Sequence, residues 1–133
     1  MHINIKNRLN DFGLKDALAL RDKVFHYQDI SKQVDACVST MIDYGVAPGD
    51  VLAIEGATSL HTVSAVLAAF AHGLIVIPMT RLPQSKRTEM LQTAEVEWLL
   101  TVDQTNEVPR LTHLDRKANH PLYAQLRRDG EPL

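Results

Sequence analysis

The sequence predicts an α/β fold, with a parallel-strand-containing sheet, crossover helices and a short β-hairpin in front. Three short apolar runs, at residues 51–55, 74–79 and 96–101, alternate with the helical segments 59–72 and 83–95. Two successive strand–helix–strand units imply parallel pairing with right-handed connections. The run LIVIPM at 74–79 is typical of a strand buried on both faces of a sheet. At 133 residues, 45% of them hydrophobic, the chain is expected to form one domain.

The hairpin is predicted at residues 17–27, where ALALR and VFHY flank the polar pair Asp22-Lys23. A helix follows at 28–44. Gly45 is expected to end it, because glycine readily adopts the left-handed conformation of a helix C-terminus. The helix buries one apolar face, formed by Ile30, Val34, Cys37, Val38, Met41 and Ile42.

The turn VAPGD leads into the strand at 51–55. The next helix, 59–72, has Thr58 or Ser59 as its cap and is apolar on nearly every side. Gly73 is expected to turn this helix tightly into the strand 74–79. Pro78 should lie at the end of that strand, since proline has no N–H for the ladder.

The second crossover helix, 83–95, accepts Pro83 in its first turn, and the strand 96–101 follows. Residues 102–119 are polar and broken by Pro109, with one apolar patch at 111–114, so no strand is predicted there. A last helix at 121–128 is expected to be capped by Asn119 or His120.

Composition excludes several classes of protein. The net charge is −2 with scattered basic residues, which disfavours nucleic acid as a partner. The single cysteine, Cys37, rules out an internal disulfide and fits a reducing compartment. No segment has the length of a membrane span or of a signal peptide, so the expected location is the cytoplasm.

No residue is predicted to be catalytic, to bind a cofactor or to hold a metal ion. The six histidines lack metal-ligand spacing, and Cys37 on its helix face is a packing residue. The loop at 56–59 precedes a helix start that can hold an anion, although an ordinary capped helix start is favoured. Arg81, Lys86 and Arg87 are placed on a solvated face rather than on a phosphate. Neither nucleotide-binding glycine motif is present.

Four motifs, taken in order, resemble the N-terminal portion of the adenylate-forming superfamily, which comprises acyl-CoA synthetases, nonribosomal peptide adenylation domains and luciferases. VFHYQDI resembles the (L/F)-T-Y-x-E-L motif, with Tyr27 matching. MIDYGVAPGDVLAI is similar to L-x-x-x-G-V-x-x-G-D-x-V-A-I, through Gly45, Gly49 and Asp50.

FAHGLIVIPMTRLP resembles L-x-A-G-x-x-x-V-P-(L/I)-D, through Gly73 and Pro78. QTAEVEWLLT is similar to the family strand that follows. The departures are His26 for threonine, His72 for alanine and Thr80 for aspartate, and they leave the substrate subclass open. The resemblance implies structural roles for the matched residues Tyr27, Gly45, Gly49, Asp50, Gly73 and Pro78.

The resemblance implies a parent enzyme that converts a carboxylate and ATP into an acyl-adenylate and then transfers the acyl group to a thiol. That parent uses ATP, Mg and either CoA or a phosphopantetheine carrier protein. The family's phosphate loop, magnesium glutamate and C-terminal catalytic lysine come later in its order, and none is found here. No cofactor is therefore expected to bind this chain alone.

The favoured hypothesis is that residues 1–133 form a single N-terminal subdomain of an AMP-forming ligase, with the phosphate-loop region and C-terminal domain absent. The subdomain is expected to be an inactive scaffold whose partner is the remainder of the ligase, in cis or as a separate chain. The alternative is a stand-alone non-enzymatic α/β binding module, or a split subunit that docks with a catalytic partner. An exposed sheet edge also makes self-association possible.

Overall fold

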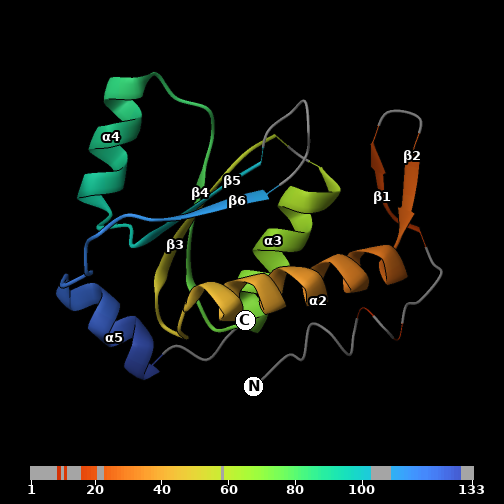
Figure 1. Ribbon diagram of the computed structural model, residues 1–133, viewed down its shortest axis with the longest axis horizontal. Helices are drawn as coiled ribbons and strands as arrows, with labels where there is room; N and C mark the ends of the chain where they lie inside the picture. The colour runs from red at the N-terminus through yellow and green to blue at the C-terminus, as the bar shows by residue number, and fades with distance from the viewer. Residues whose placement is uncertain are drawn as a thin grey trace.

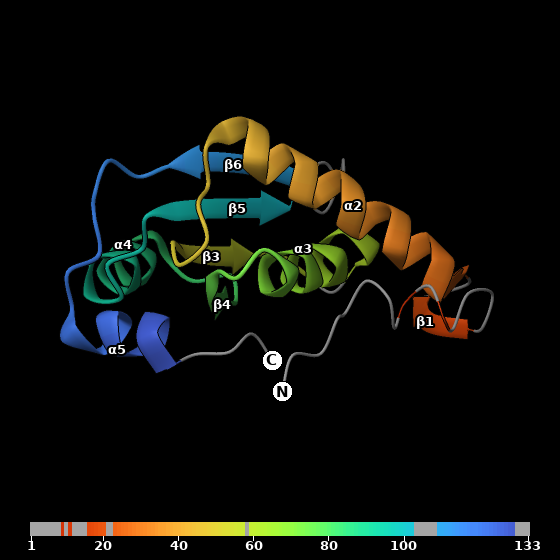
Figure 2. The ribbon, with the colours of Figure 1, turned by 90° about the horizontal axis from the view of Figure 1, so that it is seen from below.

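The computed structural model describes residues 9, 11, 16–20, 23–57, 59–102 and 109–129. The hairpin strands β1 (Asp16–Leu20) and β2 (Lys23–His26) pair antiparallel with each other in a sheet of their own. Helix α2 (Tyr27–Tyr44) follows directly and runs from the hairpin back to the main sheet (Figures 1 and 2). The hairpin therefore lies at the far end of α2, away from the main sheet.

The main sheet has four strands in the order β4-β3-β5-β6. Strand β3 (Val51–Glu55) lies between β4 (Ile75–Met79) and β5 (Trp98–Val102) and is parallel to both. Helices α3 (Leu60–Ala71) and α4 (Gln84–Thr93) make the two crossovers. The predicted fold class, a parallel-strand-containing α/β sheet with crossover helices behind a hairpin, is confirmed.

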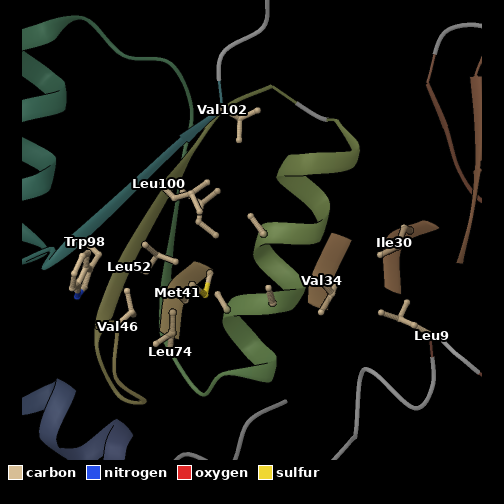
Figure 3. Packing of buried hydrophobic residues seen from close by; sticks show 14 residues of the cluster. Leu9, Ile30, Val34, Met41, Val46, Leu52, Leu74, Trp98, Leu100 and Val102 are labelled. Carbon is tan, nitrogen blue, oxygen red and sulfur yellow. The ribbon is translucent and has the colours of Figure 1, made fainter. Parts of the chain in front are cut away.

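Two apolar clusters lie on opposite faces of the sheet, so the fold has three layers, with the sheet in the middle. Helices α2 and α3 cover one face, and α4 and α5 (Pro121–Asp129) cover the other (Figure 1). Side chains alternate between the faces: Leu52 belongs to the α2–α3 side, whereas Val51 belongs to the α4–α5 side. In Figure 3 the side chains of Met41, Leu52 and Leu100 gather between the sheet and the helices of the first cluster.

The small residues of α3 allow it to lie close to its neighbours. Ala65, Ala68 and Ala69 are all fully buried in the first cluster, as is Met41 of α2. Alanine brings backbones together without leaving unfilled space, and close packing of this kind supplies dispersion energy. The helix predicted to be packed on most faces is thus held between α2 and the sheet.

One strand was missed by the sequence prediction. Strand β6 (Pro109–His113) pairs antiparallel with β5 at the edge of the sheet, within the segment expected to lack a strand. Leu111 is its only described residue that packs against an apolar cluster, and its neighbours are exposed. Pro109 opens the strand, a position where proline is tolerated.

The prediction that residues 74–79 are buried on both faces is wrong for most of the strand. Strand β4 is the other edge of the sheet: Ile75, Val76 and Ile77 are half-buried, and Pro78 is exposed. The Ile75 amide donates to the Asp50 carbonyl at 2.9 Å. The backbone N–H and C=O groups of alternate residues, counted from Ile75, therefore point toward β3. Pro78 then faces outward, and no ladder donor is lost.

Within the described residues no helix is both long and apolar enough to cross a membrane.

Candidate functional site

Four of the six family-motif residues meet at the amino-terminal edge of the parallel strands. Gly45 ends α2 at φ +89°, and its amide donates to the Ile42 carbonyl at 3.0 Å. The Gly49 amide donates to the carbonyl of Gly73 at 2.9 Å, which joins the turn before β3 to the turn before β4. Gly45, Gly49 and Gly73 all have positive φ, a conformation that glycine adopts without steric cost.

The carboxylate of Asp50 holds this turn from within. Its Oδ2 accepts from the Ala47 amide at 2.9 Å and from the Trp98 indole Nε1 at 3.1 Å. Trp98 itself is nearly buried, and its ring lies 4.5 Å from the ring of His113 on β6. The motif aspartate therefore links the start of β3 to the start of β5 through Oδ2.

His72, which stands where the family motif has alanine, also contacts this edge. Its Nε2 lies 2.7 Å from the carbonyl oxygen of Val46. Because a carbonyl only accepts, Nε2 must carry the proton in this contact. The substituted residue thus ties the end of α3 to the turn after α2.

Helix α5 is fastened to the same edge by Arg127. Its Nε donates to the Gly49 carbonyl at 2.8 Å, and its Nη2 lies 3.6 Å from Oε1 of Glu97. That Glu97 oxygen also accepts from the Val51 amide at 2.9 Å. A side chain at Gly49 would place Cβ 3.3 Å from Arg127 Nε, so glycine here also permits the close approach. Sequence reasoning missed Glu97 and Arg127, because no local pattern connects residues this far apart.

The other two motif residues lie elsewhere. Tyr27 begins α2 and packs against the first apolar cluster. Pro78 lies exposed on the outer edge of β4. His26 precedes α2, and its backbone amide donates to Oδ2 of Asp29 at 2.9 Å. Thr80 is exposed just after β4.

The carboxyl-terminal edge of the parallel strands is where open α/β sheets bind ligands. Here Glu55 ends β3, and both its oxygens accept from Arg87 Nε, at 3.2 and 2.9 Å. Arg87 was predicted to lie on a solvated face. That prediction is wrong for this residue, because it forms a partly buried ion pair whose side chains are 24% and 14% exposed. Arg81 and Lys86 are exposed as predicted.

The helix start next to this edge has the expected cap. Ser59 Oγ accepts from the Thr62 amide at 3.1 Å, and the Thr62 hydroxyl donates to the Ala57 carbonyl at 2.7 Å. Thr58, the other predicted cap, lies outside the described residues. Gly56 is close-packed, since a Cβ there would lie 3.1 Å from Cβ of Val102. This end of α3 is thus a capped helix start packed against β5.

The ionisable side chains of the described segments do not assemble a metal site. No group of three or more His, Cys, Asp or Glu residues lies close enough together to hold an ion in these segments. Cys37 is half-buried on α2, and burial raises the pKa of its thiol to about 11. A thiol with so high a pKa is a poor nucleophile at neutral pH.

A match to a protein-family model shows which family the chain belongs to. The model described as AMP-binding enzyme matches residues 6–132, which is nearly the whole chain. The chain belongs to the AMP-binding enzyme family. Among its curated relatives is enterobactin synthase component F of Escherichia coli, which is 32% identical over 106 residues. That match covers 74% of this chain and 8% of the relative, so the chain spans a small part of the relative's length.

Several solved structures share the fold. The N-terminal subdomain of NpsA from Klebsiella oxytoca superposes with a TM-score of 0.69 at 19% identity, over 83% of this chain and 34% of that one. O-succinylbenzoate coenzyme A synthetase, MenE, from Bacillus subtilis gives a TM-score of 0.70 at 21% identity, over 77% and 28% of the two chains. The chain therefore has the fold found at the N-terminus of adenylate-forming enzymes.

Proposed function

We propose that this chain is the N-terminal scaffold of an AMP-forming ligase that activates a carboxylic acid with ATP and passes it to a thiol. The observation that carries the proposal is the family match over residues 6–132, together with the likeness to an N-terminal subdomain. In the proposed reaction the carboxylate oxygen attacks the α-phosphorus of ATP, and pyrophosphate leaves. The thiol sulfur then attacks the acyl carbon, and AMP leaves.

The contacts of the motif residues support a scaffold role. Asp50 and Glu97 both accept bonds from backbone or indole N–H groups within the chain. At the opposite edge of the sheet, Glu55 is paired with Arg87. Carboxylates cannot neutralise a triphosphate, which needs cationic groups and amide donors, and the one cation of this set, the guanidinium of Arg87, is already paired with Glu55. We propose that Gly45, Gly49, Asp50 and Gly73 serve the fold, and that the residues that bind ATP lie outside these 133.

The complete enzyme is proposed to use ATP, magnesium and either CoA or a phosphopantetheine carrier. MenE was solved in complex with ATP and a magnesium ion, and NpsA in complex with 3-hydroxyanthranilyl-AMSN. The described residues of this chain do not fit a magnesium site, because they bring together no cluster of acidic, histidine or cysteine ligands. Both acceptor classes stay open, since one relative is a CoA synthetase and another structure is an adenylation domain fused to a carrier.

The proposed partner is the remainder of the ligase, joined in cis, and the proposed location is the cytoplasm. The small share of each relative that the chain covers supports this partner, from 8% of enterobactin synthase component F to 34% of the NpsA subdomain. The sheet edge at β4 and the half-exposed Leu122 and Leu126 of α5 are surfaces that such a remainder would cover.

Isotope exchange between pyrophosphate and ATP tests the proposal. The polypeptide encoded by the complete reading frame is assayed with a panel of carboxylic acids, beside the 133-residue chain. We expect acid-dependent exchange by the longer polypeptide and none by the 133-residue chain. Exchange catalysed by the 133-residue chain would contradict the scaffold role, and a complete polypeptide inactive with every acid would contradict the proposed reaction.

A further inference from the structure

A pocket on the α2–α3 side of the sheet is separate from the two ends of the parallel strands described above. It has a volume of about 270 Å³ and lies between α2, α3 and the strands β5 and β6. Its apolar wall is formed by Cys37, Met41, Leu100 and Leu111. Ser64 of α3 also lines it and is 1% exposed.

Within the part of the chain that the structure describes, the hydroxyl of Ser64 has no hydrogen-bond partner. A serine inside a helix can bond the carbonyl four residues earlier, here that of Leu60, yet this bond is not made. The other described buried polar side chains have partners: Ser59 accepts from the Thr62 amide, Glu97 accepts from the Val51 amide, and Ser31 also has one. Among the described residues, Ser64 Oγ is the one buried side-chain polar atom left without a partner. Leaving such a group unpaired is unfavourable, because it loses its hydration without gaining a bond in return.

The pocket's chemistry restricts what can fill it. Its described lining residues include the polar side chains Gln33, Thr40 and His61 but no Asp, Glu, Lys or Arg, so a charged ligand would lose its hydration without gaining a permanent counter-charge. Its volume exceeds that of a cavity of roughly 150 Å³ known to hold benzene. A single ring with one polar substituent therefore matches both its size and its one unpaired hydroxyl.

We propose that this pocket binds a compact, uncharged, mainly apolar molecule whose single polar group hydrogen-bonds to Ser64. The inference goes beyond the proposed ligase reaction, whose substrate is a carboxylate. It rests on the pocket and on Ser64, so it stands or falls independently of that reaction.

Phenol, toluene and benzoate are the probes, titrated against the 133-residue chain and followed by amide chemical shifts. Phenol and toluene have nearly the same shape and differ in the hydroxyl, whereas benzoate carries the charge that the pocket does not match. We expect saturable phenol binding with a dissociation constant on the order of 1 mM. Toluene is expected to bind roughly tenfold more weakly, and benzoate more weakly still.

Cys37 gives a second readout at the same site, because it is the single cysteine and it lines the pocket. Saturating phenol is expected to slow its alkylation severalfold. Ser64→Ala should abolish the preference for phenol over toluene. Ala36→Phe, at an exposed lining position, should block binding, while the matched Ser39→Phe on the same helix, exposed but not in the lining, should not.

The proposal is overturned if the native chain shows no saturable phenol binding, which would mean that the pocket holds water at most. It is equally overturned if Ala36→Phe and Ser39→Phe bind phenol alike, or if Ser64→Ala keeps the preference. Should Ser64→Ala fail to fold, the pair at the two exposed positions still decides the question. Benzoate binding as tight as phenol binding would overturn the assignment of an uncharged ligand.

Discussion

The carboxylate of Asp50 accepts a hydrogen bond from the indole of Trp98 at 3.1 Å, across 48 residues of sequence. The same oxygen accepts from the Ala47 amide at 2.9 Å. One atom thus closes the turn before β3 and fixes the start of β5. The contact supports the proposed structural role of the motif aspartate.

Substitution of Asp50 tests that task. Asp50→Ala removes the acceptor for both the Trp98 and Ala47 N–H groups, and we expect a loss of about 1–3 kcal/mol in the free energy of unfolding. Asp50→Asn retains one oxygen that can take the place of Oδ2, so its loss should be under about 1 kcal/mol. Urea unfolding of the two variants measures the difference. Equal losses would show that the charge, and not the acceptor position, matters.

Gly73 tests the turn between α3 and β4. Its φ is +78°, and a Cβ there would meet Pro48 at an ordinary contact distance of 3.6 Å, so strain comes from the backbone and not from a clash. Gly73→Ala should cost about 1–2 kcal/mol of unfolding free energy. Gly73→Asn should cost less, because asparagine tolerates the left-handed region. If asparagine were as costly as alanine, this explanation would fail.

Pro78 tests the sheet edge. Because its nitrogen faces away from β3, Pro78→Val adds an unpaired N–H to the exposed edge without altering the inner ladder. We expect the variant to self-associate at lower concentration than the native chain in analytical ultracentrifugation. Thr80→Val serves as the control, since it adds apolar surface at the next outward position and no new donor. Unchanged association of Pro78→Val would contradict the assigned orientation.

Cys37 makes a prediction about pH. With its thiol pKa raised to about 11, its alkylation rate should rise close to tenfold per pH unit up to that value. At pH 8 the native chain should react on the order of a hundredfold more slowly than the urea-unfolded chain, whose thiol has an ordinary pKa. A rate that levels off near pH 9 in the native chain would show that the thiol is not shielded.

The raised pKa of Cys37 also makes the stability of the fold depend on pH. The folded pKa lies above the unfolded one, so the stabilising contribution of the protonated thiol is fully present below about pH 9 and is lost as pH rises toward 11. Cys37→Ala should lack this part of the decline in urea unfolding midpoint between those pH values. A decline of the same steepness in both chains would assign it to other groups.

Much of the fold follows from local pattern, while the contacts between distant residues do not. Apolar periodicity and the glycines placed the helices and the parallel strands, because those signals are carried by neighbouring residues. Strand β6 was missed, since Leu111 is its only described residue that packs against a cluster and its pairing is imposed by β5. The exposure of β4 was missed because the apolar residues of this strand do not indicate its place in the strand order, which puts it at the edge of the sheet.

The candidate site shows the same division. Gly45, Gly49, Asp50 and Gly73 were singled out because they match family motifs, and the structure brings them to one edge of the sheet. Trp98 and Arg127, which donate to Asp50 and Gly49, were not singled out, and neither was Glu97, which pairs with Arg127. An ion pair or an indole contact with a distant residue leaves no spacing to recognise. Arg87 was wrongly predicted to lie on a solvated face for the same reason, since its partner Glu55 is distant in sequence.

The reading frame beyond the codon for Leu133 tests the central claim most directly. The N-terminal scaffold role predicts that the frame continues into a Ser/Thr/Gly-rich segment followed by lysine, the phosphate loop of the adenylate-forming family. A stop codon directly after Leu133, with no adjoining frame that encodes such a segment, would contradict the claim that this chain is part of a single-chain ligase.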